Sequence, residues 1–565
     1  MRIFSGIFFG ILAVLAFALA CHTQDRGGQT RDEDQIVEKI DSPLPFSKGV
    51  NFSAWFEARS AQTIIFTAYT EQDFINAKSM GIEIIRLPIR LHDMTGGAPE
   101  YRLEPLFLRF LDQAVEWAEK HEIYLILDNH SFDPVAPTAT DIGKILIPVW
   151  TQIAERYKSR GGYILYEILN EPHGIDAKLW DAIQGRVIAA IREIDSVHSV
   201  IAGGVNYNSL DELFNVSAYQ YDNIIYTFHF YDPYLFTHQG ETWGSPPNLK
   251  NLKGLPFPAD SQVARKMPAV PSDLKGTWIE RALKDSYKKD AAVSALAATL
   301  DKAVKFSKER GNVPLLCGEF GVYIPNSLQE DRVRWYEAVT KLLDERGIAR
   351  TSWDYYGGFG VFRTTGGSSF ESELNTEVVK AMGFPPPPQV KAEKIRGAFT
   401  LFDNFPAART AALEHWASAL NLYHPNNEKY ALGWKDADRY GSFMFFFKKE
   451  IDWEFLKERN YAVTFSAKTD KSCTFDVRLI NREDASSIPW RLNTTVKIEA
   501  DGKWHTVRIP LTELNEQGAW INASQKWLTP QGKFSWSNIA ALVFTAEEKD
   551  NHGITILFDA IGLEP

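Results

Sequence analysis

Residues 163–172 read YILYEILNEP, from Tyr163 to Pro172, and this stretch decides the fold class. Its apolar side chains occupy successive positions rather than alternate ones, which is typical of a parallel strand covered on both faces. The strand ends in the polar pair Asn170-Glu171, and a proline follows at once. A strand buried on both faces needs similar strands beside it, so further runs of successive apolar residues should recur along the chain.

Eight such candidate strands lie between residues 46 and 384: Gly49–Phe52, Ile82–Pro88, Ile123–Asn129, Tyr163–Asn170, Ser199–Val205, Asn223–His229, Val313–Phe320 and Ile348–Asp354. Helical patterns separate them, as in Glu104–His121, where Leu108, Leu111 and Val115 share one face. Eight strand–helix units in about 340 residues predict an α/β fold, a (β/α)8 TIM barrel. The longest insertion, 232–290, suits a loop that lines one side of a cleft, and a disordered or purely packing insertion is the alternative.

Polar side chains stand at the expected strand ends, where barrel enzymes place their active sites. They are two glutamates with six possible helpers: Glu171, Glu319, Arg86, His130, Asn170, His229, Tyr231 and Trp353. Glycoside cleavage needs two carboxyl groups at one bond, one protonated for the leaving oxygen and one ionised to attack the anomeric carbon. A shared site separates their pKa values, because two nearby negative charges resist joint ionisation.

The helpers suit supporting roles in that chemistry. Arg86 could keep one carboxylate ionised and oriented. Asn170 could donate to the sugar 2-hydroxyl, and Tyr231 could bond the nucleophilic carboxylate. His130 and His229 could bond sugar hydroxyls or the carboxylates.

Residues 46–384 resemble glycoside hydrolase family 5. Leu169-Asn170-Glu171-Pro172 resembles the family's acid/base signature, and Gly318-Glu319-Phe320-Gly321 resembles its nucleophile strand. The remaining polar residues fall where the family has its active-site residues: Arg86, His130, Asn170, His229, Tyr231 and Trp353. The resemblance implies retention of configuration through a glycosyl-enzyme intermediate on Glu319. Glu171 would act first as acid and then as base, with no cofactor.

The substrate expected from this resemblance is a β-1,4- or mixed-linkage glucan. The opening Gly49–Glu57 looks more like endoglucanase-type members than mannanases. An open groove containing Trp55, Trp243 and Trp353 would favour an endo mode, because sugar rings stack on flat apolar faces. An exo-acting β-glucosidase or β-1,3-glucanase is the main alternative, and a mannanase or xyloglucanase is another.

Two other classes fit less well. A non-catalytic surface protein that binds glycans on a degenerate barrel would lack a carboxylate or a helper, and none is missing. A metal-dependent hydrolase could use Asp128, His130 and His229 as ligands. The first strand, however, carries no His-x-His, and the key strand ends carry glutamates.

The four prolines Pro385–Pro388 mark a domain boundary, since such a run is stiff and extended. We predict a Pro-rich linker over 385–394 and an all-β sandwich over 395–565, where short strands alternate with turns. Its opening Phe402-Asp403-Asn404-Phe405 and its closing strand Ile556–Ile561 resemble galactose-binding-like jelly-roll domains used as carbohydrate-binding modules. That resemblance implies a possible structural calcium at Asp403 and Asp559. A purely structural sandwich is the alternative.

Residues 1–21 read as an export signal, with Arg2 before an apolar stretch and Ala18-Leu19-Ala20-Cys21 resembling a bacterial lipobox. Lipidation of Cys21 would tether the chain to the cell envelope, at the outer membrane or cell surface, through a polar segment over 22–45. A cleaved signal that releases a secreted protein and an uncleaved anchor are the alternatives. The lipid would be the chain's only membrane attachment.

Composition narrows the possible partners. The net charge of −11 argues against nucleic acid as a partner. The other two cysteines, Cys317 and Cys473, fall in different predicted domains, so we expect no disulfide between them. We expect a monomer whose partner is a β-glucan polysaccharide or oligosaccharide.

Overall fold

The structure is a computed structural model, and it describes residues 39–244, 248–260, 265–366, 369–391, 393–406, 410–423, 430–483 and 487–565. The export signal with Cys21 lies outside the described residues, as does most of the predicted tether. Among the described residues, no helix is both long enough and apolar enough to cross a membrane.

The predicted (β/α)8 barrel is confirmed. Eight parallel strands close into a barrel in chain order, and β1 pairs with both β2 and β8. The strands are β1 (Lys48–Asn51), β2 (Ile84–Ile89), β3 (Tyr124–Asn129), β4 (Ile164–Glu167), β5 (Ser199–Gly203), β6 (Ile224–Phe230), β7 (Leu315–Phe320) and β8 (Ala349–Ser352). Nearly every strand position is buried, as the unbroken apolar runs indicated.

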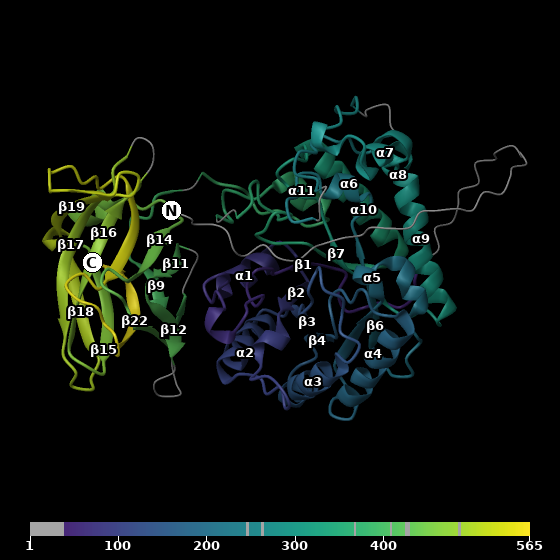
Figure 1. The fold of residues 1–565 in the computed structure, drawn as a ribbon, viewed down its shortest axis with the longest axis horizontal. Helices are drawn as coiled ribbons and strands as arrows, with labels where there is room; N and C mark the ends of the chain where they lie inside the picture. The colour runs from purple at the N-terminus through teal and green to yellow at the C-terminus, as the bar shows by residue number, and fades with distance from the viewer. Residues whose placement is uncertain are drawn as a thin grey trace, which may run out of the picture.

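Helices surround the barrel (Figure 1). The longer ones are α1 (Glu71–Ser79), α2 (Pro105–Lys120), α3 (Gly143–Tyr157), α4 (Ala177–Arg192), α9 (Val293–Glu309), α10 (Gln329–Arg346) and α11 (Thr376–Ala381). Short helical turns lie between strands: η1 (Ala61–Thr63), η2 (Leu91–Met94), α5 (Val205–Asn208) and η3 (Leu210–Asn215). The helix predicted over 104–121 is α2, and its apolar face buries Phe107, Leu111 and Val115.

The fourth strand ends earlier than its apolar run suggested. β4 stops at Glu167, whereas the run continues to Asn170. The backbone N–H of Asn170 still donates to the carbonyl of Asn129 at 3.0 Å. The chain therefore leaves the ladder gradually and carries Glu171 onto the carboxyl-end face of the barrel.

The insertion after β6 is packed and partly helical rather than a plain loop. It contains α6 (Tyr234–Thr237), η4 (Ser272–Leu274), α7 (Trp278–Asp285) and α8 (Tyr287–Asp290). Its apolar side chains, Leu249, Leu255, Phe257 and Ile279 among them, are almost completely buried. Ile40, which lies inside the segment predicted as tether, is already buried against the barrel region. Its backbone N–H donates to the Arg346 carbonyl.

The C-terminal region is all-β and antiparallel. One sheet contains β9 (Phe399–Asp403), β10 (Phe405–Pro406), β12 (Ala419–Tyr423), β13 (Ala431–Lys435), β15 (Ala462–Thr469), β18 (His505–Pro510) and β22 (Thr555–Glu564). The other runs β11-β14-β21-β16-β17-β19-β20, with β11 (Ala411–Trp416), β14 (Ser442–Phe447), β16 (Cys473–Asn481), β17 (Trp490–Ile498), β19 (Asn515–Ile521), β20 (Lys526–Leu528) and β21 (Ile539–Thr545). Two short helices complete it, α12 (Trp453–Glu458) and η5 (Leu511–Glu513).

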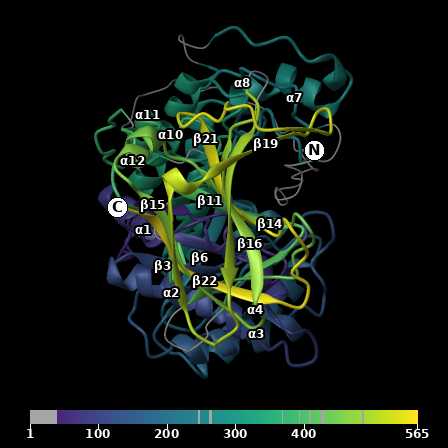
Figure 2. The same cartoon turned by 90° about the vertical axis from the view of Figure 1, so that its left-hand side faces the viewer.

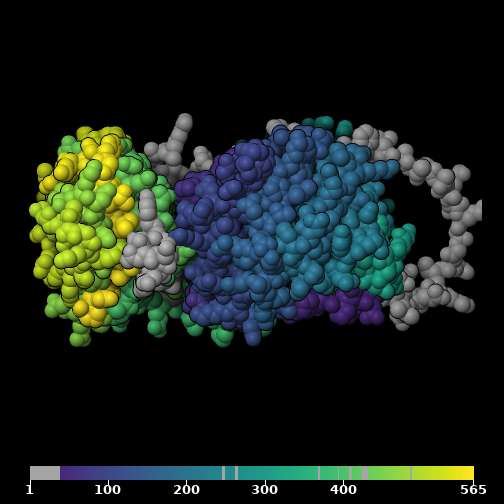
Figure 3. Space-filling model, turned by 90° about the horizontal axis from the view of Figure 1, so that it is seen from below, coloured from purple at the N-terminus to yellow at the C-terminus, as the bar shows by residue number. Residues whose placement is uncertain are grey.

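This region lies beside the barrel at one end of an elongated molecule (Figures 1 and 3), and Figure 2 looks onto it from that end. Phe405 bridges the two parts, with its ring centroid 5.2 Å from Trp117 and 6.3 Å from Phe110 of α2. Because Phe405 is only 6% exposed, the contact is a packed apolar interface.

Candidate active site

Arg86 stands at the centre of the barrel mouth and is fully buried on β2. Its guanidinium donates to both oxygens of Glu167 at 2.8 Å and to Glu319 Oε1 at 2.8 Å, and it pairs with Asp128 at 3.0 Å. It also donates to Asn170 Oδ1 at 2.7 Å. The planar guanidinium thus fixes four side chains, from β3, β4, the segment after β4 and β7, in one arrangement.

Glu319, at the end of β7, is held from two sides. Arg86 binds Oε1, and the Tyr231 hydroxyl donates to Oε2 at 2.9 Å. Burial raises the pKa of Glu319, while Arg86, His130 and the Tyr231 hydrogen bond oppose that rise. A carboxylate held by a guanidinium and a phenol hydroxyl is oriented and favoured in its ionised form.

Glu171 has a different environment. Its Oε1 lies 2.7 Å from His229 Nδ1, whereas its Oε2 is buried and has no hydrogen-bond partner. Burial and the nearby Glu319 charge raise the pKa of Glu171 well above its usual value. Burial also lowers the pKa of His229 well below its usual range, so the imidazole is neutral. Glu171 therefore favours its protonated form.

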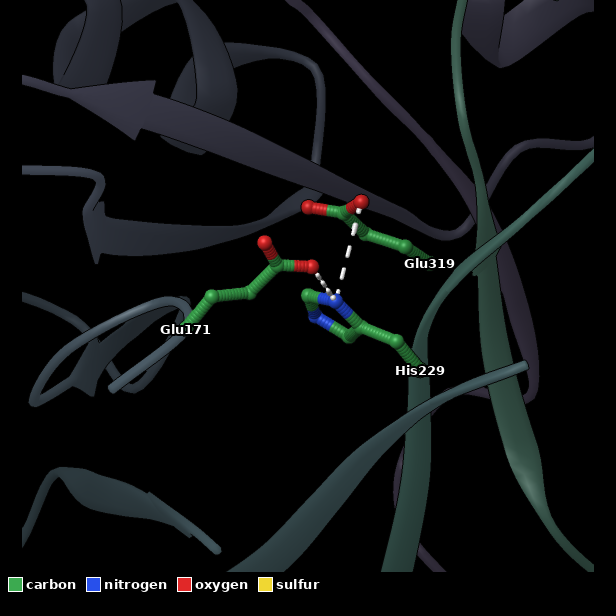
Figure 4. A group of neighbouring side chains, drawn as sticks. All are labelled: Glu171, His229 and Glu319. Atoms are coloured by element: carbon green, nitrogen blue, oxygen red, sulfur yellow. Dashed lines mark hydrogen bonds and ion pairs between the residues drawn. The ribbon is translucent and has the colours of Figure 1, made fainter. Parts of the chain in front are cut away.

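Figure 4 shows the two carboxyl groups facing each other, with His229 beside both. His229 Nδ1 is 3.7 Å from Glu319 Oε2, and one ligand atom from each of the three side chains lies within 4.8 Å of the others. Such a trio could hold a metal ion by distance alone. The buried Arg86 cation, however, already neutralises Glu319 from 2.8 Å and would repel a second cation there.

His130 and Trp353 form one wall of the mouth. Their rings stack with centroids 5.5 Å apart and planes 12° apart. His130 Nδ1 lies 2.7 Å from Asp128 Oδ2, and its Nε2 lies 3.5 Å from Asn170 Nδ2. Burial lowers the pKa of His130 and raises that of Asp128 to about 7. The structure thus brings together all eight side chains that the sequence placed at this mouth.

Three further polar residues belong to this network and were not singled out from the sequence. Glu167 and Asn51 bond directly to Arg86. Glu57 lies 3.8 Å from His130 Nε2. A charged residue inside an apolar strand run, as at Glu167, implies a buried partner and could have signalled its role. Glu57 carries no such signal, because it follows β1 in an irregular segment.

Of the three tryptophans expected to line a groove, Trp243 and Trp353 lie near the mouth and Trp55 does not. Trp55 is 2% exposed and stacks on Trp117 in the core, so the prediction that it lines a groove was wrong. Trp243 does approach the mouth, because it and Tyr231 both contact the Phe359 ring, at 6.3 and 6.0 Å. Trp55 lies in the irregular segment after β1, where its side chain packs toward Trp117 of α2 rather than outward.

The calcium site implied by Asp403 and Asp559 is not supported. Asp559 Oδ1 accepts the backbone N–H groups of Asn404 and Ala560, at 3.0 and 2.8 Å. In the part of the chain that the structure describes, no group of three potential ligands forms around this pair. One oxygen of Asp559 is thus used as a backbone acceptor, and the described residues place no third His, Cys, Asp or Glu ligand atom beside this pair.

A closed (β/α)8 barrel whose mouth holds two glutamates in unlike electrostatic settings belongs to the class of glycosidases that hydrolyse O-glycosyl compounds. More particularly, residues 47–358 match the cellulase model of glycosyl hydrolase family 5, and the chain is a member of that family.

Curated relatives agree with this assignment. Endoglucanase C of Acetivibrio thermocellus is 30% identical over 332 residues, covering 55% of this chain and 92% of its own. Endoglucanase 3 of Fibrobacter succinogenes is 30% identical over 339 residues, which cover 56% of this chain and 50% of that protein. A solved structure described as an endoglucanase is 23% identical, covers 60% of this chain and 96% of its own, and has a TM-score of 0.50. This last similarity supports the barrel fold alone.

Proposed function

We propose that the chain is a retaining endo-β-glucanase that hydrolyses β-1,4- or mixed-linkage glucans by double displacement. The observation that carries the proposal is the short separation of Glu171 and Glu319, which have carboxyl oxygens within 4.8 Å of each other. Retaining glycosidases hold their carboxyl groups about 5–5.5 Å apart, whereas inverting enzymes leave about 6.5–9.5 Å for a water molecule.

In the first step, Glu171 gives its proton to the glycosidic oxygen while the Glu319 carboxylate attacks the anomeric carbon. The bond to the leaving sugar breaks, and an ester forms between Glu319 and the remaining sugar. His229 occupies Oε1 of Glu171, so the unpartnered Oε2 carries the proton to be transferred.

In the second step, the Glu171 carboxylate takes a proton from water, and the water oxygen attacks the anomeric carbon. The ester breaks, and Glu319 returns as a carboxylate held by Arg86 and Tyr231. Asn170 is held through its oxygen by Arg86, which orients its amide group to donate to the sugar 2-hydroxyl. The two carboxyl groups and water suffice, so the mechanism includes no cofactor.

The nucleophile is tested with Glu319→Gly. This change should abolish polysaccharide hydrolysis, and added azide or formate should restore turnover of an activated aryl glycoside by filling the vacated space. The product's anomeric configuration, followed by NMR, reports retention or inversion. Full activity in Glu319→Gly would refute the assignment, and an inverted first product would refute double displacement.

The glucan preference rests on the endoglucanase relatives and on the aromatic wall formed with Trp353. Release of reducing sugar from carboxymethylcellulose, lichenan, xyloglucan, glucomannan and laminarin tests it. Activity on the first two is expected. Activity on laminarin alone would favour the exo-β-1,3 alternative, and activity on glucomannan or xyloglucan alone would favour the mannanase or xyloglucanase alternative.

The proposal extends to the ends of the chain. The C-terminal sheets would serve as a carbohydrate-binding module, and the protein would be an exported monomer. Cys21 would carry the lipid that tethers it to the envelope. We expect Cys21→Ala to move the protein from the membrane fraction to the soluble fraction, measured by fractionation and immunoblotting. Unchanged membrane association would argue against lipidation.

A further inference from the structure

The outer face of the seven-stranded sheet β11-β14-β21-β16-β17-β19-β20 carries an unusual set of polar side chains. On β16, Val477 and Leu479 are buried in the core, so Asp476 and Arg478 lie on the opposite face. From β17, Asn493 donates to Asp476 at 2.7 Å. Thr495, two residues along, donates to the same carboxylate at 2.7 Å, so four neighbouring side chains share this face.

Several of these groups are buried without complete hydrogen bonding. Arg478 is 6% exposed and Asn493 is 7% exposed. Arg478 Nε, Asn493 Oδ1 and Arg491 Nε are buried and have no partner. An orphaned buried polar atom is destabilising, so three of them on one face point to a ligand that would satisfy them.

Arg491 is notable because no ion pair or hydrogen bond holds its guanidinium within the described residues. It is aligned with Gly518 across the β17–β19 pairing, and its guanidinium carbon lies 4.8 Å from the Trp527 ring centroid. Burial, with Arg478 nearby, lowers the pKa of Arg491 to about 10, so it stays charged at neutral pH. The group is positioned by stacking while its donors remain available.

Gly518 makes this arrangement possible. A Cβ there would lie 2.0 Å from the Leu528 carbonyl oxygen and 3.1 Å from Trp527 Cζ2. The absent side chain therefore lets the indole lie across β19 toward Arg491. Trp527 is still 45% exposed and pairs in register with Trp520 on the neighbouring strand. A flat, half-exposed aromatic surface thus adjoins the orphaned polar atoms.

The charges on this face balance. Arg478 contacts Asp476 at 3.3 Å and Glu547 at 2.7 Å, so the two arginines face two carboxylates. A balanced face that offers donors, an acceptor and an aromatic plane suits a neutral polyhydroxylated ring better than an anion. The strands that carry it, β16, β17 and β19, lie at the end of the molecule farthest from the barrel (Figure 1).

We infer that Trp527, Arg491, Asn493 and Arg478 form a glycan-binding site for a neutral β-glucan chain, separate from the barrel mouth. The inference rests on the proposed function, because the ligand class is that of the barrel's proposed substrate. A sugar ring stacks on the exposed part of Trp527, and its hydroxyls pair with the orphaned Nε and Oδ1 atoms. The site holds the enzyme on the polymer while the barrel cleaves elsewhere.

The test uses the full chain carrying Glu319→Gln, so that polysaccharide is bound but not consumed. Affinity electrophoresis in gels containing barley β-glucan or hydroxyethylcellulose measures association. Adding Trp527→Ala or Arg491→Gln should weaken association about ten-fold or more, as expected when an aromatic or arginine anchor is truncated. Tyr221→Ala, an exposed aromatic residue preceding β6 on the barrel, is the matched control and should leave retardation unchanged.

The outcomes separate this inference from the catalytic proposal. Equal retardation of the Glu319→Gln chain with and without Trp527→Ala or Arg491→Gln would overturn the inference, because all binding would then occur in the barrel. Retardation by polygalacturonate but not by the glucans would contradict the inference that the site binds a neutral glycan. Failure of the unmutated chain to hydrolyse any glucan, with binding intact and sensitive to Trp527, would contradict the proposed catalysis while supporting the binding site. Thermal unfolding of each variant confirms that it is folded.

Discussion

At the scale of single residues, the site depends on how one cation is shared among buried carboxylates. Arg86 contacts Glu319, Glu167 and Asp128, while Glu171 lies beyond its hydrogen bonds. The carboxyl group nearest the guanidinium is stabilised as an anion, and the one beside neutral His229 is pushed toward its acid form. This asymmetry suits the two glutamates to the different tasks that we propose for them.

Tyr231→Phe tests that asymmetry. The hydroxyl donates to Glu319 Oε2, so its loss should raise the pKa of Glu319. In the proposed mechanism Glu319 must be ionised to attack, so activity should be lost as the pH falls through its pKa. The acid limb of the kcat/KM profile should therefore move upward by about one to two pH units, since a hydrogen bond to a charged group is worth about 1.5–3 kcal/mol.

In the proposed mechanism the alkaline limb of that profile reports Glu171, which would have to stay protonated, and Tyr231→Phe should move this limb less. The profiles are measured on a soluble aryl glycoside from pH 3 to 10. An unchanged acid limb would mean that Tyr231 does not tune Glu319.

At the scale of elements, the barrel is closed by a short strand that approaches its neighbour very closely. A Cβ at Gly49 would lie 1.9 Å from the Ile84 carbonyl oxygen, which belongs to the backbone of β2. The β1–β2 pairing there leaves room only for glycine, and the same pairing sets Asn51 beside Arg86. Strand spacing and site geometry are therefore linked.

Gly49→Ala should force these strands apart and lower the free energy of unfolding by about 1–3 kcal/mol, measured by urea denaturation. Activity should fall as well, because Asn51 and Arg86 shift. Gly162→Ala is the control, since a Cβ there meets nothing within 4 Å. Equal stability of the two variants would contradict the close approach.

At the scale of the whole molecule, the two parts of the chain are coupled through Phe405. Its ring packs against Trp117 and Phe110 of α2 and against Tyr430 of its own region, 6.0 Å away. The apolar contact fixes the sandwich beside the barrel and so keeps the proposed glycan-binding face at a set distance from the active site.

Phe405→Ala should remove about 3–5 kcal/mol of packing and separate the unfolding of the two parts into distinct calorimetric transitions. Trp416→Ala, which truncates a side chain that is 60% exposed on the same region, should leave the thermogram unchanged. A thermogram of Phe405→Ala identical to that of the unmutated chain would show that Phe405 does not couple the two parts.

The sequence by itself predicted the barrel, because eight apolar runs separated by helical patterns are typical of parallel strands buried on both faces. It also determined which polar side chains meet at one mouth, since parallel strands bring their carboxyl ends to one face. The sequence did not predict the burial of Trp55 or the packing of the insertion after β6. Whether such side chains point outward or inward depends on neighbours that are distant in the chain.

Only the tertiary structure decided how the charges are shared. The contacts of Arg86 with Glu167 and Asp128, the separation of Glu171 from Glu319, and the orphaned atoms around Arg491 come from side chains that are far apart in sequence. Their energies depend on burial and on distances of a few ångströms. Sequence periodicity specifies which face a residue occupies, but only packing sets those distances.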